Sequence, residues 1–443
     1  MANPFVSIFR VKELRERIFF TCMMLVVFRI GAFIPIPGVN ARALNAFFMS
    51  QQGSRNAIVD YLDFFAGGAF SNFSVFMLGI MPYISMSIIM QLLLIVFPKL
   101  KKISQEEGGK KKIQKYTRMG TVGVCLVQSF AVTQYAQSIS RSVDNFLSLD
   151  IFAFTIIAMI TVTTGTMFLM WIGEQITKRG IGNGISLLIF AGIVARIPEA
   201  FIELGRRVRA GDLNLVFVVV VLLMFVVVVT LVVYEQQGQR KIPVNYAKRI
   251  VGRRMYGGAP NAFIPFKINP SGVIPVIFAS SILTFPLQIA STIGENVTWL
   301  GMVSRALTPD GTVYNIMYVL LIVFFAYFYT QVTLNPIEIA KNIRENGGSI
   351  PGIRSEKIEE YLTRILNRIV LPGAFYLAGI AITPTLIQYF FNFPTSVAYL
   401  LGGTSLLIMV GVDLDTMSQI EAMLKMHHQE GLTKKGRLRG RNL

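Results

Sequence analysis

Long apolar runs separated by short polar stretches dominate the chain. The clearest run is residues 215–234, LVFVVVVLLMFVVVVTLVVY, in which Thr230 is the one weak polar group. Twenty such residues in an α-helix match the roughly 30 Å of hydrocarbon in a bilayer. Similar runs of about 18–23 residues recur along the chain. They predict ten membrane-spanning helices, at about 18–36, 74–97, 117–137, 151–172, 183–202, 215–234, 272–291, 314–334, 369–390 and 396–416.

The composition is typical of an integral membrane protein. Of its 443 residues, 53% are hydrophobic and only 15% are charged, and the mean hydropathy is +0.57. A soluble domain needs more charge than this to cover its surface. The two cysteines, Cys22 and Cys125, both fall inside predicted spans, so a disulfide framework is not expected. We therefore predict an all-α integral membrane protein.

The basic residues orient the predicted helices. An even number of spans puts both termini on one side, and most of the 42 Lys and Arg residues lie in the termini and alternate loops. The positive-inside bias then makes both termini cytoplasmic. Residues 98–117 are a simple Lys cluster that suits either a partner or anionic lipid. Residues 235–271 and 335–368 also carry aromatic, Ile and turn residues, which predicts protruding hairpins for an acidic or RNA-containing partner.

Two segments, five predicted helices apart, resemble each other. Residues 79–89 read GIMPYISMSII and residues 272–282 read GVIPVIFASSI, sharing Gly, Pro, Ile, Ser and Ile without a gap. An odd separation makes equivalent helices run in opposite directions, which is the pattern of an inverted repeat with a functional path between the halves. The alternative is chance similarity between two apolar segments that contain proline.

An apolar stretch interrupted by glycine and polar residues precedes the second predicted span. It begins at Asp63, and Gly67-Gly68 and Ser71-Asn72 interrupt its apolar residues. Such a segment cannot cross lipid unaided, because unsatisfied backbone groups there cost several kcal/mol. It can lie at membrane depth only inside protein. We predict a short re-entrant half-helix that fills a cavity between the halves as a stopper.

Candidate chemistry is sparse. The predicted spans are nearly free of Asp, Glu, His and Lys, and Arg29 is the exception, placed where it can snorkel outward. No phosphate-binding loop, nucleophile–base pair or metal cluster stands out, and RGIGNGIS (179–186) suits a closely packed helix entry. We therefore expect no catalysis, cofactor or metal. What remains is an apolar path closed by a stopper, and an apolar constriction can block ions by dewetting.

These segments resemble the SecY family, the central subunit of the protein-conducting channel, over nearly the whole chain. The segments that are similar to its signatures, in its order, are FRIGAFIPIPG (28–38), FFAGGAFS (64–71), LGIMPYIS (78–85), TGTMFLMWIGEQIT (164–177), RGIGNGIS (179–186), VNYAKR (244–249), GVIPVIFASSI (272–282), FFAYFYT (324–330), PGIR (351–354) and LGGTSLLI (401–408).

The resemblance implies two inverted five-helix halves with a re-entrant plug, in a channel that opens across the membrane and sideways into lipid. The halves would cover residues 18–205 and 206–418, between an amphipathic segment 1–17 and a basic tail 419–443, with the plug at about 60–73. Unfolded secretory and membrane polypeptides would pass through, driven by a ribosome or a SecA-type motor ATPase. SecE-type and SecG-type small subunits, anionic lipids and a bacterial inner membrane are also implied.

Carried over position by position, the resemblance implies four sets of residues. The apolar pore ring would be Ile80, Ile84, Ile185, Ile189, Ile277 and Ile408. The plug would contain Asp60, Phe64, Phe65, Gly67, Gly68 and Phe70. The lateral gate would lie near Ser85, Gln91 and Phe285. Docking of the ribosome or motor would use Arg253, Arg254 and Arg354.

One departure from the family pattern affects docking. The family commonly has NPxE with a basic third residue after the eighth span, and this chain has Ile337 there. That puts one partner contact in question, although not the docking itself.

Two other functions are open from the sequence. A secondary transporter on an inverted repeat would need intramembrane carboxylates or a half-helix site for an anion, and neither stands out. A membrane insertase or scaffold without a pore would have no need of the stopper.

Overall fold

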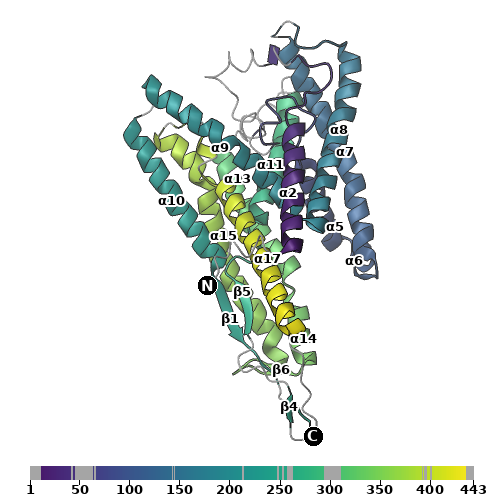
Figure 1. Ribbon diagram of the computed structural model, residues 1–443, viewed down its shortest axis with the longest axis vertical. Coiled ribbons are helices and arrows are strands. Elements are labelled where there is room, and N and C mark those ends of the chain that lie inside the picture. The colour runs from purple at the N-terminus through teal and green to yellow at the C-terminus, as the bar shows by residue number, and fades with distance from the viewer. Residues whose placement is uncertain are drawn as a thin grey trace. The chain divides into compact units, whose positions relative to one another are not determined.

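The computed structural model confirms the all-α architecture (Figure 1). It describes residues 11–40, 43–44, 63, 66–141, 143, 145–211, 214–246, 249–251, 254–256, 263–293, 311–391, 393, 397–399 and 402–435. In this part of the chain, each of the ten predicted spans overlaps one long helix. These helices are α2 (Lys12–Gly31), α5 (Met81–Val96), α7 (Gly109–Ser140), α8 (Ile151–Arg179), α9 (Gly184–Ala210), α10 (Leu215–Gln237), α11 (Ile274–Ile293), α13 (Thr312–Thr333), α15 (Ile358–Phe391) and α17 (Thr404–Lys435).

Fewer helices qualify as spans by length and hydropathy alone. Within the described residues six do so, and a seventh if α5 and the short helix α6 (Pro98–Gln105), bent by 103°, are one broken span. Helix α5 has only 16 residues. The first turns of α2 are charged, with Arg17 paired to Glu13 at 2.9 Å. The chain is a multi-pass membrane protein in which some helices depend on their neighbours for burial.

The chain divides into two compact units. The first comprises residues 1–202, 288–298 and 408–443, and the second comprises residues 203–287 and 299–407. The division after residue 202 lies next to the predicted boundary at 205. From Ile408 onward, however, α17 belongs to the first unit, where the side chain of Gln419 accepts a hydrogen bond from the Gly182 amide at 2.9 Å.

The first unit contains the glycine-rich turn as a helix entry. In this unit α7 packs against α5 and α8, and α2 packs against α8. Helix α9 begins at Gly184, whose backbone lies so close to the Gly173 carbonyl of α8 that a Cβ would overlap it. Gly182, just before, has a φ of +82°. A side chain is excluded at 184 by space and disfavoured at 182 by φ, which explains the glycines in RGIGNGIS.

In the second unit the two predicted basic loops are folded together. Antiparallel pairs join β1 (Gln239–Pro243) to β5 (Phe263–Lys267) and β3 (Arg249–Val251) to β4 (Arg254–Tyr256). A third pair joins β2 (Asn245–Tyr246) of the first loop to β6 (Gly348–Ser349) of the second. The hairpins predicted for 235–271 are therefore present, whereas the described part of 335–368 forms a helix and a single short strand instead of a hairpin, and backbone pairing joins the two loops.

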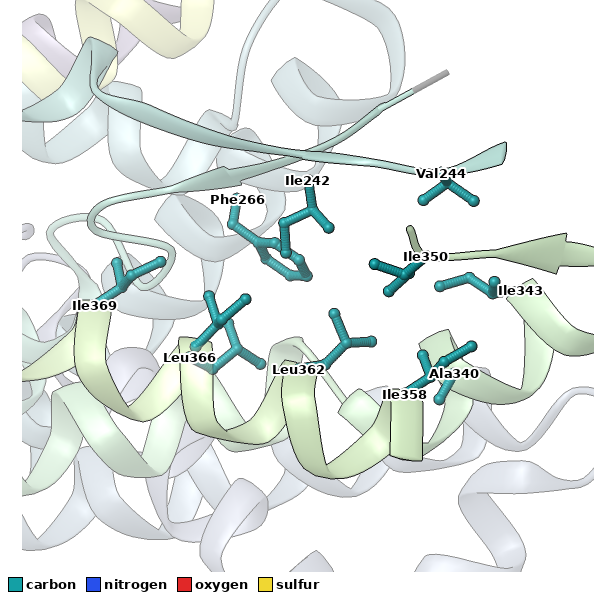
Figure 2. Packing of buried hydrophobic residues seen from close by; sticks show 11 residues of the cluster. Ile242, Val244, Phe266, Ala340, Ile343, Ile350, Ile358, Leu362, Leu366 and Ile369 are labelled. Atoms are coloured by element: carbon teal, nitrogen blue, oxygen red, sulfur yellow. The ribbon is translucent and has the colours of Figure 1, made fainter. Parts of the chain in front are cut away.

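A hydrophobic core supports these loops at the start of α15 (Figure 2). Alternate residues Ile242 and Val244 of one loop point to the same side, as side chains do along an extended chain. They meet residues of α15 that recur every three or four positions, so one stripe of this helix faces the sheet. The buried cluster consists of Ile242, Val244, Phe266, Ala340, Ile343, Ile350, Ile358, Leu362, Ile365, Leu366 and Ile369. We call it the loop core.

The two repeat segments have the same local structure. Gly79 and Gly272 have φ values of +57° and +59°, and each stands two residues before a helix whose first turn contains proline. The amide of each glycine donates to the carbonyl three residues earlier. The amide of Ile84 donates to Ile80, as that of Ile277 donates to Val273. Two helices that begin with these equivalent hydrogen bonds are better explained by a repeat than by chance.

Candidate channel plug and pore ring

The broken apolar segment is buried in the first unit, and from residue 67 onward it is not helical, although Asp63 and Ala66 before it are. Its described residues 67–80 form successive turns, with positive φ at Gly67, Gly68, Phe73 and Gly79. One side of the segment pairs with the chain that follows α2: the Ile36 amide donates to the residue 73 carbonyl at 2.8 Å, and the residue 75 amide donates to residue 34 at 2.9 Å. The predicted half-helix is therefore wrong for this part, because left-handed residues interrupt helical hydrogen bonding.

Asp63 fastens the beginning of this segment. Its carboxylate accepts hydrogen bonds from the Ser71 amide at 2.9 Å and the Ser71 hydroxyl at 2.5 Å. It also pairs with Arg196 of α9, with Nη1 and Oδ2 2.7 Å apart. The Asp63 side chain is 1% exposed and that of Arg196 is 10% exposed. A buried charge is tolerated when it is paired and hydrogen-bonded in this way.

Arg29 binds the backbone of the same segment. Its Nη1 donates to the Gly67 carbonyl at 2.7 Å, and its guanidinium lies 4.8 Å from the centre of the Phe33 ring. The prediction that Arg29 snorkels outward is therefore wrong, because the side chain finds a backbone acceptor within the protein. Arg196 is a further charged residue inside a predicted span, which the hydropathy pattern did not single out.

Aromatic rings hold the remainder of the segment. Phe73 is fully buried, stacks on Tyr135 of α7 at 6.0 Å and meets Phe146 edge-on at 5.6 Å. Phe70 packs against the same tyrosine at 5.8 Å. Farther along, Phe76 stacks on Phe28 at 6.3 Å. Such pairs contribute about 0.5–1.5 kcal/mol each beyond the area they bury, so the segment is seated in the unit along its length.

The predicted plug residues are only partly within the described chain. Gly67 and Phe70 are buried and Gly68 is half-buried. Asp60, Phe64 and Phe65 lie outside the described residues.

The predicted ring residues are mostly buried. Ile80 and Ile84 lie one turn apart at the start of α5, and Ile185 and Ile189 lie one turn apart on α9. All six are buried except the half-buried Ile185. A lipid-facing side chain would be exposed in an isolated chain, so burial argues against the lipid-facing alternative for five of them. Ile277 belongs to the second unit and the other five to the first. That the six isoleucines form a single pore ring stays a prediction.

The predicted lateral-gate residues also differ in what is described. Ser85 and Gln91 are half-buried on α5. The Oε1 atom of Gln91 is buried and has no hydrogen-bond partner in the described part of the chain. Phe285 falls within α11, but its side chain lies outside the described residues.

Two of the three predicted docking arginines lie on the folded loops. Arg354 is exposed just before a short 3₁₀ helix, Ser355–Lys357, that leads into α15. Arg254 begins β4, although its side chain is not described, and Arg253 lies outside the described residues. Positive charge on a rigid, folded surface is suited to binding an acidic partner.

The departure at Ile337 has a local structural role. Asn335 caps α14 (Pro336–Glu345), and its side-chain oxygen accepts a hydrogen bond from the Ile337 amide at 3.1 Å. Proline in the first turn suits the start of a helix. The Ile337 side chain is 55% exposed, so the helix places no packing demand on the third position of this motif.

The chain is similar in sequence to known proteins over nearly its whole length. The family model described as SecY matches residues 74–417. The chain is 46% identical to the protein translocase subunit SecY of Borreliella burgdorferi over 427 residues, which cover 96% of each chain. It is 43% identical to that of Vibrio cholerae over 437 residues, covering 97% of this chain and 96% of the relative.

Solved structures share the fold. Each of three structures covers 92% of this chain and is itself covered to 92%. The first, described as a protein conducting channel, superposes with a TM-score of 0.66 at 21% identity. The second concerns a SecY protein whose plug domain stabilises the closed state and maintains a membrane seal, with a TM-score of 0.63 at 20% identity. The third is Sec61 in the canine ribosome–channel complex, with a TM-score of 0.61 at 19% identity. The sequence match over nearly its full length and the shared fold show that this chain belongs to the SecY family.

Proposed function

We infer that this chain is the central, pore-forming subunit of a protein-translocation channel, and that its re-entrant segment is the plug of that channel. The observation that carries the proposal is the segment itself: residues 67–80 are non-helical, yet largely buried inside a unit of membrane helices. Irregular backbone at membrane depth requires protein around it. A segment that does not cross the membrane, and that fills space inside the unit, can act as a seal that moves out of the channel.

The ring supplies the second part of the seal. In this proposal the constriction of the path is formed by Ile80, Ile84, Ile185, Ile189, Ile277 and Ile408. Branched apolar side chains hold no water when they meet, and so they exclude ions without any charged filter. The same lack of hydrogen-bonding groups lets every kind of side chain pass. Unfolded polypeptides thus cross through the ring, and apolar segments leave sideways between α5 and α11.

The folded basic loops are the docking surface for the driving partner. Arg253, Arg254 and Arg354 bind a ribosome or a SecA-type motor ATPase on the cytoplasmic side. The pairing of β2 with β6 and the loop core support this proposal, because they hold both loops as one rigid surface. SecE-type and SecG-type subunits complete the complex in a bacterial inner membrane, where both termini are cytoplasmic and anionic lipids meet the Lys cluster at 98–117.

The alternative of a secondary transporter is not favoured. The curated relatives are protein translocase subunits. The described residues include three buried carboxylates, Asp63, Glu174 and Glu235. Arg196 and Ser71 satisfy the first, Arg118 satisfies the second, and the third follows the predicted span 215–234 at the end of α10. A transporter site would instead leave such a group facing the substrate path.

Two variants and two readouts test the proposal. Deleting residues 60–73 should give a folded channel that leaks small ions at rest and still binds ribosomes, because these residues span no lipid. Arg354→Glu should keep the resting seal and lose affinity for the ribosome or motor, because its side chain is exposed. Loss of one charged contact with a buried partner group costs about 2–5 kcal/mol. Wild-type resting conductance in the deletion variant would refute the plug, and unchanged affinity for both partners would refute the docking site.

A further inference from the structure

Asp63 and Arg196 form the most deeply buried ion pair in the described part of the chain. Their side chains are 1% and 10% exposed, whereas in every other ion pair of the described residues at least one partner is 35% or more exposed. Exposed pairs contribute little. A buried pair behaves differently, because removing one partner leaves an uncompensated charge away from water. The position of this pair is therefore strongly constrained.

The Asp63 carboxylate connects two parts of the molecule. Its bonds with the Ser71 amide and hydroxyl close the loop between residues 63 and 71 on itself. Its bond with Arg196 Nη1 ties that loop to α9. The first two contacts shape the plug and the third docks it. Changing Arg196 thus tests docking without altering the groups that shape the loop.

The backbone also meets α9 at this place. Gly67 has a φ of +66°, and a Cβ built on it would lie 2.7 Å from the Cα of Gly192. Arg29 of α2 donates to the carbonyl of the same Gly67. The loop is therefore seated directly on the α9 backbone, one turn before Arg196, and α2 holds it from another helix. The ion pair therefore lies next to the close backbone contact between Gly67 and Gly192.

We propose that Arg196 is a positioning residue of the resting channel, and that its ion pair with Asp63 is a latch that holds the plug on α9. This inference rests on the proposed role of the segment as a plug. Moving the plug requires separating the two charges. Their attraction is strong in a site without water and falls steeply when water surrounds both groups. The latch therefore holds the dry, closed state and releases once an opening channel admits water to it.

Neutral and conservative substitutions test the latch by ion leak through resting channels in membrane vesicles. Arg196→Gln and Asp63→Asn each leave one buried charge without its partner, and we expect each to raise the leak about tenfold or more. A tenfold change equals about 1.4 kcal/mol. Removing one partner of a buried ion pair costs more than this. Arg196→Lys keeps the charge and should stay closer to wild type. Arg207→Gln is the matched control, because it removes another arginine–carboxylate pair of α9 that is 35% exposed on each side.

The double variant Asp63→Asn with Arg196→Gln distinguishes a latch from general damage. It removes both charges of the pair and leaves neither without its partner, so it should leak less than either single variant. Leaks that simply add in the double variant would overturn the latch, and so would single variants that seal like wild type. The deletion of residues 60–73 in the same assay separates the two ideas: a leaky deletion with sealed single variants refutes only the latch, whereas a sealed deletion refutes the plug.

Thiol labelling checks that the plug itself moves. Phe70 is 4% exposed in the closed structure, so Phe70→Cys should resist a membrane-impermeant thiol reagent. In the Arg196→Gln background, with Cys22 and Cys125 replaced by Ser, we expect the reagent to label it at rest. Continued protection in that background, alongside a raised leak, would place the leak elsewhere and overturn the latch.

Discussion

The loop core gives a prediction whose size follows from the structure. Leu362 lies on the stripe of α15 that faces the paired loops, and its side chain is fully buried (Figure 2). Leu362→Ala removes three carbon atoms from the centre of this core and leaves a cavity. Large-to-small changes of this kind cost about 2–5 kcal/mol, the upper part of the range applying where neighbours cannot collapse into the space. Here strands on one side and a continuous helix on the other restrict collapse.

Limited trypsin digestion of the purified, membrane-reconstituted protein measures this cost. The loops contain many Lys and Arg sites, and cleavage tracks the population of the opened form when opening is fast. A loss of 2 kcal/mol corresponds to a cleavage rate roughly 30 times that of wild type. Affinity for the ribosome or motor should fall together with this protection, because the docking surface is then ordered for less of the time.

A neighbouring residue serves as the matched control. Glu360 lies on the same helix and is 65% exposed, and its one ion-pair partner among the described residues is Arg364, one turn away. Glu360→Ala should change the cleavage rate little, because exposed pairs of this type contribute about 0.3–0.5 kcal/mol. Equal cleavage of the Leu362→Ala and Glu360→Ala proteins would show that the cluster is not a cooperative core, and the account of how the loops are held would then fail.

Three further changes test other parts of the structure. Ile408→Asp should give a stable, leaky channel by conductance measurement if this residue faces the ring; a lipid-facing residue would instead cost about 2.5–3.5 kcal/mol on insertion and yield poorly assembled protein without leak. Gly165→Ala should lower thermal stability by about 1–3 kcal/mol, because its Cβ would overlap the carbonyl oxygen of residue 75, whereas Gly123→Ala on α7 meets no atom within 4 Å and should not. Glu174→Gln weakens the two hydrogen bonds from Arg118 that join α7 to α8 and should cost about 1–3 kcal/mol in the same melt; an unchanged melting temperature would contradict that role.

Local patterns were enough to predict much of the fold. Apolar runs predicted each long helix, because burying a helix in lipid requires about twenty apolar residues in succession. Turn residues among Ile and aromatic residues predicted the hairpins at 235–271. The shared Gly and Pro of the two repeat segments predicted equivalent helix starts, since positive φ and a missing amide are properties of single residues. Residues of this kind determine conformation within a few positions of themselves.

Contacts between distant parts of the chain were decided only by the tertiary structure. Asp63 and Arg196 are 133 positions apart, and neither lies in a repeating pattern that would pair them. The strand pair that joins the two basic loops brings Tyr246 opposite Gly348, and strands of two residues leave no periodic signal. The seat of the plug likewise depends on Gly67 meeting Gly192, which neither glycine predicts alone. Such contacts depend on which surfaces the helices bring together, because a hydrogen bond or an ion pair is specified by the positions of two groups and not by the identity of either one.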